Sequence, residues 1–385
     1  MGFFQKLEYL EIRLIIKMAI IIFIIILSIL VLIHEFGHFF MAKRNGIGVE
    51  EFGIGLPPRI WGKKIGETIY SVNWLPFGGF VRLIGEDPTD DRRDQKNSFY
   101  TKSIWQRSQV VVAGVVMNLL LAVIVFYVVL AALGFKFHLP NFFPHEFKFA
   151  KQTTTVQVVD VGQDSPAAAA GIEIGESIIE IDGQPVGSVE TLQTIIQAAE
   201  DKDIGIVLES PVDNSIRSVR ARPQFSQELN APALGIGLGE LITLNYETPV
   251  QKLASGFTHS YNMVEYSGKV LGQLIGFSIR ERDITPVSEG ISGPIGIAAI
   301  TSQAVSLGVL STVQLAGILS LNLAILNILP IPALDGGRFA FIIFEAVTRK
   351  RPHAIFEKWV HTAGFALLIG LILLITYNDI LKLIR

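Results

Sequence analysis

Residues 19–44 read AIIIFIIILSILVLIHEFGHFFMAKR, and this stretch decides the fold. It is apolar from Ala19 to Ile33 and on to Met41, close to the roughly 20 residues that a helix needs to cross a bilayer core of about 30 Å. The run passes straight into a His-Glu-Phe-Gly-His motif at residues 34–38. The small-residue cleavage site of a secretory signal peptide is missing, so we expect a retained transmembrane helix.

Three further apolar stretches of similar length follow, from Val110 to Leu133, from about Leu310 to Leu329 and from about Trp359 to Tyr377. The chain has 50% hydrophobic residues and a mean hydropathy of +0.46, which is high for a wholly soluble protein. We therefore predict an α-helical polytopic membrane protein with about four transmembrane helices, in contact with the lipid bilayer.

Charge and cysteine content exclude two classes of function. The formal net charge is -3 and the basic residues form no concentrated run, so nothing indicates a nucleic-acid partner. The chain has no cysteine, which excludes disulfides, thiolate metal ligands and a cysteine nucleophile. Any metal ion must therefore be held by His, Asp or Glu.

Basic residues near the spans predict which loops are cytoplasmic. Those flanking the first loop and the loop between spans three and four are Lys43, Arg44, Lys102, Arg107, Arg349, Lys350, Arg351 and Lys358. We expect a multi-pass protein of the cell (inner or plasma) membrane, with both loops cytoplasmic and residues 134–309 extracytoplasmic. The same orientation places both termini on the extracytoplasmic side, which the basic residues Arg13 and Lys17 oppose. A start at Met18 would remove both residues. Residues 1–17 are therefore interpreted as an N-terminal extension or a misassigned start.

The motif at residues 34–38 has the spacing of a metal site. His34 and His38 are four residues apart, so on a helix they lie on one face and can direct both imidazoles at one ion. Glu35 beside them can act as general base and acid on a water that the metal activates. Because such groups are costly to place in lipid, their position at the end of a span indicates function rather than packing.

The best candidate for a third ligand lies in a remote motif. The nearby Glu50 and Glu51 stand in a sequence pattern that indicates exposed side chains, so they are poor candidates. Residues 327–337 read NILPIPALDGG, in which two prolines must interrupt the third span before Asp335. Broken backbone at membrane depth is tolerated only where it is buried in protein or faces a wet cavity. A carboxylate placed there indicates a cation, so Asp335 is predicted to join the two histidines.

Residues 153–240 differ in composition from their surroundings and indicate a separate α+β domain. The segment is polar, punctuated by glycine and rich in short alternating runs. Ser165-Pro166 can open a short helix that Gly171 ends, Asp182-Gly183 suits a turn between strands, and 191–199 would form a second helix. The segment resembles the PDZ domains of bacterial proteases, which implies peptide binding or gating. A plain spacer domain is the alternative.

Together, the HExGH and NxxPxPxLDG patterns resemble the site-2 protease family of intramembrane zinc metalloproteases, at every defining position. The order of spans and PDZ domain is similar to the bacterial branch that cleaves anti-sigma factors. The resemblance implies a Zn²⁺ ion held by His34, His38 and Asp335, with Glu35 catalytic. It implies hydrolysis of peptide bonds in or near transmembrane segments of single-span proteins already shortened by another protease. The PDZ domain would control substrate access, either by binding peptide ends or by excluding bulky substrates.

Further roles follow from the resemblance. The residues implied in substrate binding are Asn327, Pro330, Pro332, Gly78 and Gly79. For Asn327 a hydrogen bond between helices is the alternative, and for Asn118 in the second span packing is equally favoured.

The first cytoplasmic loop is strand-like and rich in glycine at residues 51–55 and 68–83. The family has a re-entrant β-structure at this place, which implies a loop that dips into the membrane and holds an unwound substrate as a strand. A surface hairpin that touches only headgroups is the alternative.

The predicted domain order is residues 18–133 as the first part of the membrane core, then the PDZ domain, 241–309 as an amphipathic or interfacial connector, and 310–385 as the second part of the core. The remaining histidines match no ligand spacing and are expected to be solvated or interfacial: His138, His145, His259, His353 and His361.

Two other classes of protein stay open on the sequence. A membrane scaffold with structural zinc would not need Glu35. A metal transporter should show ligands along several spans, whereas here they converge on one site.

Overall fold

The computed structural model describes residues 3–87, 89–199, 202–210, 215–227, 229–283, 285 and 290–384, without the side chains of 3–17, 383 and 384. The chain divides into two compact units, Met1–Val129 with His259–Arg385, and Leu130–Thr258. The backbone from Phe3 onward is part of the first helix. Of residues 1–17 the structure describes only this backbone, and their interpretation as an N-terminal extension or a misassigned start stays a prediction.

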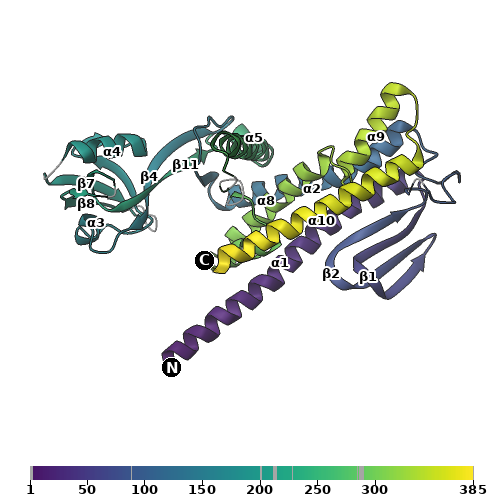
Figure 1. The fold of residues 1–385 in the computed structure, drawn as a ribbon, viewed down its shortest axis with the longest axis horizontal. Helices are drawn as coiled ribbons and strands as arrows, with labels where there is room; N and C mark the ends of the chain where they lie inside the picture. The colour runs from purple at the N-terminus through teal and green to yellow at the C-terminus, as the bar shows by residue number, and fades with distance from the viewer. Residues whose placement is uncertain are drawn as a thin grey trace. The chain divides into compact units, whose positions relative to one another are not determined.

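Four helices of the first unit are long and apolar enough to cross a membrane, as predicted (Figure 1). They are α1 (Phe3–Arg44), α2 (Ile104–Ala132), α8 (Val309–Ile328) and α10 (Ala354–Ile384). Large apolar side chains cover their outer surfaces; on α1 these include Ile21 and Ile25, each at least half exposed. Helices that are apolar on all sides are suited to a lipid environment.

The predicted strand-like loop forms β1 (Val49–Ile65) and β2 (Thr68–Leu83), which pack against α1 (Figure 1). Residues 51–54 of β1 are paired on both sides, with 79–82 and with 69–72. The Ser28 hydroxyl of α1 donates to the carbonyl of Pro76, 2.6 Å away. Since Ser28 lies 16 positions before Arg44, the loop reaches about 24 Å along α1 from its C-terminal end.

The third span is broken where the prolines predict. After Ile328 the backbone turns through Pro330 and Pro332, Ala333 takes a positive φ of 77°, and α9 (Asp335–Thr348) begins. A Cβ on Gly336 would lie 2.0 Å from the carbonyl oxygen of Leu329. Glycine there lets the turn fold back onto the start of α9, so that Asp335 stands at a helix N-terminus.

The connector contains α5 (Pro249–Glu281) and α7 (Pro294–Ser306). Helix α7 packs against α1 and α8. Its N-terminus is held by buried Asp379 of α10, whose carboxylate accepts from the amides of Gly293 (3.3 Å) and Gly296 (2.8 Å). An anion at this position satisfies helix amides that have no partner within the helix.

The second unit contains an antiparallel sheet in the order β3-β11-β4-β5-β7-β8, with β6 beside β5. Figure 1 labels β4, β7, β8 and β11 of this sheet. Its elements are β3 (Lys136–Pro140), β4 (Lys151–Val161), α3 (Pro166–Ala169), β5 (Ser177–Ile181), β6 (Gln184–Pro185), α4 (Val189–Ala198), β7 (Ile204–Glu209), β8 (Ile216–Ala221), β9 (Gln224–Ser226), β10 (Ala231–Ala233) and β11 (Ile236–Asn245). Buried Val156, Ile178, Leu192 and Leu208 belong to a core made of this unit's own residues.

The local signals read from the sequence of this unit are confirmed. The Ser165 hydroxyl caps α3 by accepting from the amide of Ala168, and Pro166 occupies its first turn. Gly171 follows with a φ of 72°. Asp182 and its neighbouring glycine make the turn between β5 and β6, and the second predicted helix is α4.

Candidate metal centre

Helix α1 brings the two histidines of the motif together. His34 and His38 are both buried, and their Nε2 atoms lie 3.1 Å apart. The Nδ1 of His38 lies 2.8 Å from the carbonyl oxygen of Val110 on α2. A carbonyl can only accept, so Nδ1 carries the proton and Nε2 keeps its lone pair for a metal.

Helix α9 adds the carboxylate. Oδ2 of Asp335 lies 2.9 Å from Nε2 of His34 and 3.2 Å from Nε2 of His38. Ligand atoms of a tetrahedral zinc site are about 3.3 Å apart, because each zinc–ligand bond is about 2.0–2.1 Å long. Two imidazoles and a carboxylate at these separations fit zinc, and a fourth position can be taken by water.

Helix α2 leaves room for the cluster. A Cβ added to Gly114 would lie 2.4 Å from Nε2 of His38 and 2.7 Å from Nε2 of His34. One turn further along α2, fully buried Asn118 places its amide 3.5 Å from Nδ1 of His34. The sequence interpretation did not predict that α2 packs against the two histidines. The available signal was the spacing of Gly114 and Asn118, one helical turn apart.

Glu35 lies beside the cluster, where an Oε2 accepts from the amide of Val81 at 3.0 Å. A cavity of about 230 Å³ opens next to it, lined by Val31, His34, Glu35, Asn118, Leu323, Asn327, Ala333, Leu334 and Asp335. A carboxylate facing a small polar cavity beside three ligand atoms can take a proton from a water held there. Neither the contact with Val81 nor the histidine contact with Val110 has a sequence signal, because both are made by backbone atoms.

The residues implied in substrate binding occupy different places. Asn327 lines the cavity. Pro330 and Pro332 instead line a separate apolar groove of about 380 Å³ between α9 and α10. Gly78 and Gly79 pack on α1, where an added Cβ would lie 2.7 Å from Val31 and 3.3 Å from Leu32 respectively. Of these five residues, only Asn327 lines the cavity in the described structure, and for all five a substrate-binding role stays a prediction.

The expectation of solvated or interfacial histidines is wrong for His259, which is fully buried with its ring 5.0 Å from that of Phe126. Packing of α5 against α2 overrides the polarity of a single imidazole. His361 of α10 has a role that the sequence did not indicate. Its Nδ1 accepts from the amide of Ala333, 3.0 Å away, and so holds the turn that precedes Asp335.

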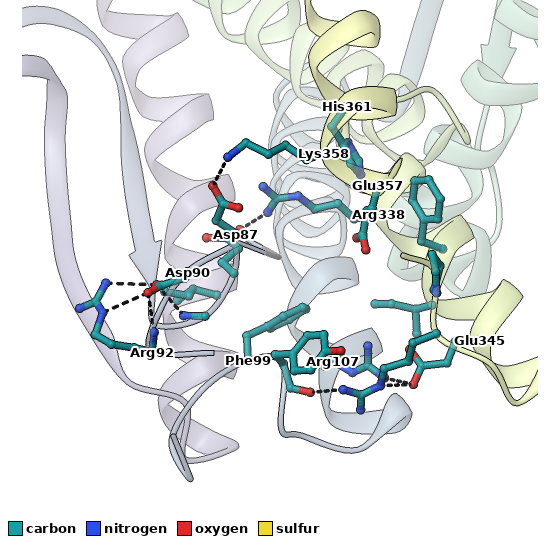
Figure 2. A pocket seen from close by; sticks show the side chains of 18 of the residues that line it. Asp87, Asp90, Arg92, Phe99, Arg107, Arg338, Glu345, Glu357, Lys358 and His361 are labelled. Carbon is teal, nitrogen blue, oxygen red and sulfur yellow. Dashed lines mark hydrogen bonds and ion pairs between the residues drawn. The ribbon is translucent and has the colours of Figure 1, made fainter. Parts of the chain in front are cut away.

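A larger charged cavity of about 460 Å³ lies between residues 82–107 and the helices α9 and α10 (Figure 2). Arg338, one turn after Asp335, pairs with Glu86 at the end of the hairpin. Glu345 accepts from Arg107 and Arg351, each at 2.8 Å. Burial alone would raise the pKa of Glu345, but these two partners outweigh it and hold the pKa below its ordinary value. The pairs tie α9, and with it Asp335, to the hairpin and α2.

Comparison with known proteins gives one family match, described as peptidase family M50, over residues 22–371. A Clostridium perfringens protein named as a candidate zinc metalloprotease is 32% identical over 365 residues, covering 94% of this chain and 99% of that protein. The Bacillus subtilis regulator of sigma-W protease RasP is 28% identical over 448 residues, covering 95% and 99%. The solved PDZ domain of an SdrC-like protein from Listeria innocua matches 22% of this chain and 92% of its own, at 25% identity and a TM-score of 0.20.

Proposed function

This chain belongs to peptidase family M50 and is an intramembrane zinc metalloprotease, and from that membership we propose that it hydrolyses peptide bonds within or near transmembrane segments of single-span membrane proteins. The observation that carries the proposal is the convergence of two histidines, a carboxylate and Glu35 from α1 and from the broken third span. A site built within apolar helices suits a substrate that is itself a membrane segment.

His34, His38 and Asp335 are the proposed ligands of Zn²⁺. When bound there, zinc would make the attacking water more acidic and would polarise the substrate carbonyl. Glu35 takes the proton of the attacking water and returns it to the leaving amine. The amide of Val81 and the polar cavity hold its carboxylate in position for this transfer.

The hairpin is the proposed substrate platform. A helical substrate hides its amides in i to i-4 bonds, so the peptide to be cut must first unwind. Residues 79–82 pair with β1 on one side, while the amide of Val81 points the other way, to Glu35. An extended substrate that adds to this edge would run past the general base. Asn327 lines the cavity, and its proposed role is to hold the backbone of such a strand.

The domain in residues 153–240 is proposed to act as a PDZ gate. A groove of about 660 Å³ lies between α4 and the start of β11, lined in part by Ile196, Gln193 and Leu238. An extended peptide end can add to a strand edge beside a helix in this way. The proposed substrates are single-span proteins already shortened by another protease; by analogy with the relative named as a regulator of sigma-W, they include anti-sigma factors.

We assign the protein to the cell membrane, with the hairpin loop cytoplasmic and the PDZ domain on the opposite side. Support comes from the basic residues that flank both predicted cytoplasmic loops, Arg107 and Arg351 among them.

Substitution of Glu35 tests the function. Glu35→Gln keeps the size of the side chain but cannot accept the proton, so cleavage of a single-span substrate should fall by at least about 100-fold. Zinc content should stay at the wild-type level. The control is Glu67→Gln, in the exposed turn between β1 and β2, which should cleave normally. Chelator should abolish wild-type cleavage and added zinc restore it. Cleavage by Glu35→Gln at the wild-type rate would refute the mechanism.

A further inference from the structure

The two histidine ligands differ in what holds their second nitrogen. A histidine that binds zinc through Nε2 carries its proton on Nδ1, and that N–H needs an acceptor to fix the ring. For His38 the acceptor is the carbonyl oxygen of Val110. For His34 the neighbouring polar group is the side-chain amide of Asn118.

The side-chain amide of Asn118 is buried, and of its two polar atoms only the nitrogen has a hydrogen-bonding neighbour in the described part of the chain. The residue is fully buried, and its Oδ1 has no hydrogen-bond partner among the described residues. Its Nδ2 lies 3.5 Å from Nδ1 of His34. If Nδ1 carries a proton, two N–H groups face each other there, which leaves both the histidine proton and the amide oxygen unsatisfied.

A half-turn of the carboxamide removes both defects. It exchanges the oxygen and nitrogen ends, so that Oδ1 takes the place beside Nδ1 of His34. We propose that Asn118 is a positioning residue, whose Oδ1 accepts from the Nδ1–H of His34 and thereby fixes the tautomer that presents Nε2 to zinc. This inference rests on the proposed metal site.

The surroundings of Asn118 support this role over packing alone. An apolar side chain would fill the space without the cost of burying an amide, about 1–3 kcal/mol when it is unsatisfied. The Ser320 hydroxyl of α8 donates to the backbone carbonyl of Asn118 at 2.8 Å, which fixes this turn of α2. Gly114, one turn earlier, lets α2 approach the two imidazoles closely enough for the contact.

The test compares two substitutions of Asn118 in the full-length protein in detergent. Asn118→Leu has a similar volume but no acceptor, and its zinc dissociation constant, measured by competition with a chelator, should rise about 10–100-fold. The new carboxylate of Asn118→Asp can accept a hydrogen bond but cannot donate one. The zinc dissociation constant of this variant should therefore stay within about threefold of the wild-type value. The control is Val116→Leu, at an exposed position of the same helix, which should keep wild-type zinc affinity.

Absorption of the Co²⁺-substituted protein gives a second readout that does not depend on cleavage. The spectrum of Asn118→Leu should change, whereas those of Asn118→Asp and Val116→Leu should match the wild type. Wild-type zinc affinity in Asn118→Leu would overturn the proposal while leaving the metal site intact. If Asn118→Leu does not fold, weakened binding by a folded Asn118→Asp would overturn it. A wild-type protein that binds no zinc would refute the metal site and this proposal together.

Discussion

Gly114 lies where α2 passes the two imidazoles of α1. It contributes no ligand, yet a Cβ at this position would overlap Nε2 of His38 and crowd that of His34. Backbone groups contribute as well, since the carbonyl oxygen of Val110 orients one ring and the amide of Val81 holds Glu35. At the scale of single residues, the centre therefore depends on close approach of main chain as much as on its four reactive side chains.

Substitution of this glycine should damage the metal site more than the fold. Gly114→Ala adds one methyl group that must displace an imidazole, and we expect zinc affinity to fall at least about tenfold, with a matching loss of cleavage. Chelator competition measures the affinity. Val116→Ala, at an exposed position of the same helix, is the control and should bind zinc as the wild type does. Equal zinc affinity in the two variants would contradict the role of Gly114 in the close approach of α2 to the histidines.

Among the secondary-structure elements, the hairpin of β1 and β2 depends most on its docking against α1. Ser28 holds Pro76, and Gly78 takes a φ of 71° with Val31 directly beside it. The docked segment leads to Val81, the contact of Glu35. Displacement of the hairpin would therefore move the proposed substrate edge while leaving the metal ligands in place.

Two glycines of this hairpin give a matched pair of variants. Both have positive φ, so alanine strains the backbone by about 1–2 kcal/mol at either position. At Gly78 the new Cβ would also lie 2.7 Å from Val31, whereas nothing lies within 4 Å of it at Gly66. We expect Gly78→Ala to lower cleavage at least about tenfold at unchanged zinc content. Gly66→Ala should stay close to wild type, and equal rates in the two variants would argue against the docking role.

The break between α8 and α9 is the element that sets the third ligand. Pro330 and Pro332 end the helical hydrogen bonding, and Gly336 allows the chain to fold back on itself. His361 then binds the amide of Ala333, and Arg338 ties the new helix to Glu86. The turn before Asp335, the proposed third ligand, is thus held from both sides.

At the scale of the whole molecule, the chain consists of two compact units with separate cores. The metal centre lies entirely within the first. In the second, buried Glu176 accepts from Arg217 at 2.7 Å through both of its oxygens. Burial alone would raise the pKa of Glu176, but the hydrogen bonds and charge of Arg217, together with the backbone amide of Glu173, outweigh it and lower the pKa.

A variant of this pair should destabilise one unit only. Arg217→Met should lower the free energy of unfolding of residues 130–258 by about 1–3 kcal/mol at pH 7. Because the folded pKa of Glu176 is lowered, the pair stabilises above the unfolded value of about 4.3 and is lost as the pH falls through the folded pKa. The difference between variant and wild type should therefore shrink below about pH 4, as urea unfolding of this segment at both pH values would show.

Full-length Arg217→Met should keep wild-type zinc affinity, since the three proposed ligands, His34, His38 and Asp335, all lie in the first unit. A loss of zinc affinity in this variant would contradict the independence of the two units. Stability differences that grow toward low pH would contradict the assigned role of Glu176.

The sequence by itself determined the four spans, the metal motif, the broken third span and the local turns of the second unit. Each is a short-range pattern: an apolar run of fixed length, histidines at i and i+4, prolines that remove helix bonds, and capping residues such as Ser165. Asp335 could be predicted as a metal ligand because a carboxylate after a broken span needs a cation. Pairing it with the histidines also drew on the combined motif of the family.

Tertiary structure alone decided what surrounds the ligands. The acceptor for His38 is a backbone carbonyl on α2, and the donor to Glu35 is a backbone amide on β2, so neither leaves a mark in side-chain patterns. The two-sided pairing of residues 51–54 and the burial of His259 were likewise set by packing between distant segments. Such contacts depend on how helices and strands approach in space, which local residue preferences do not specify.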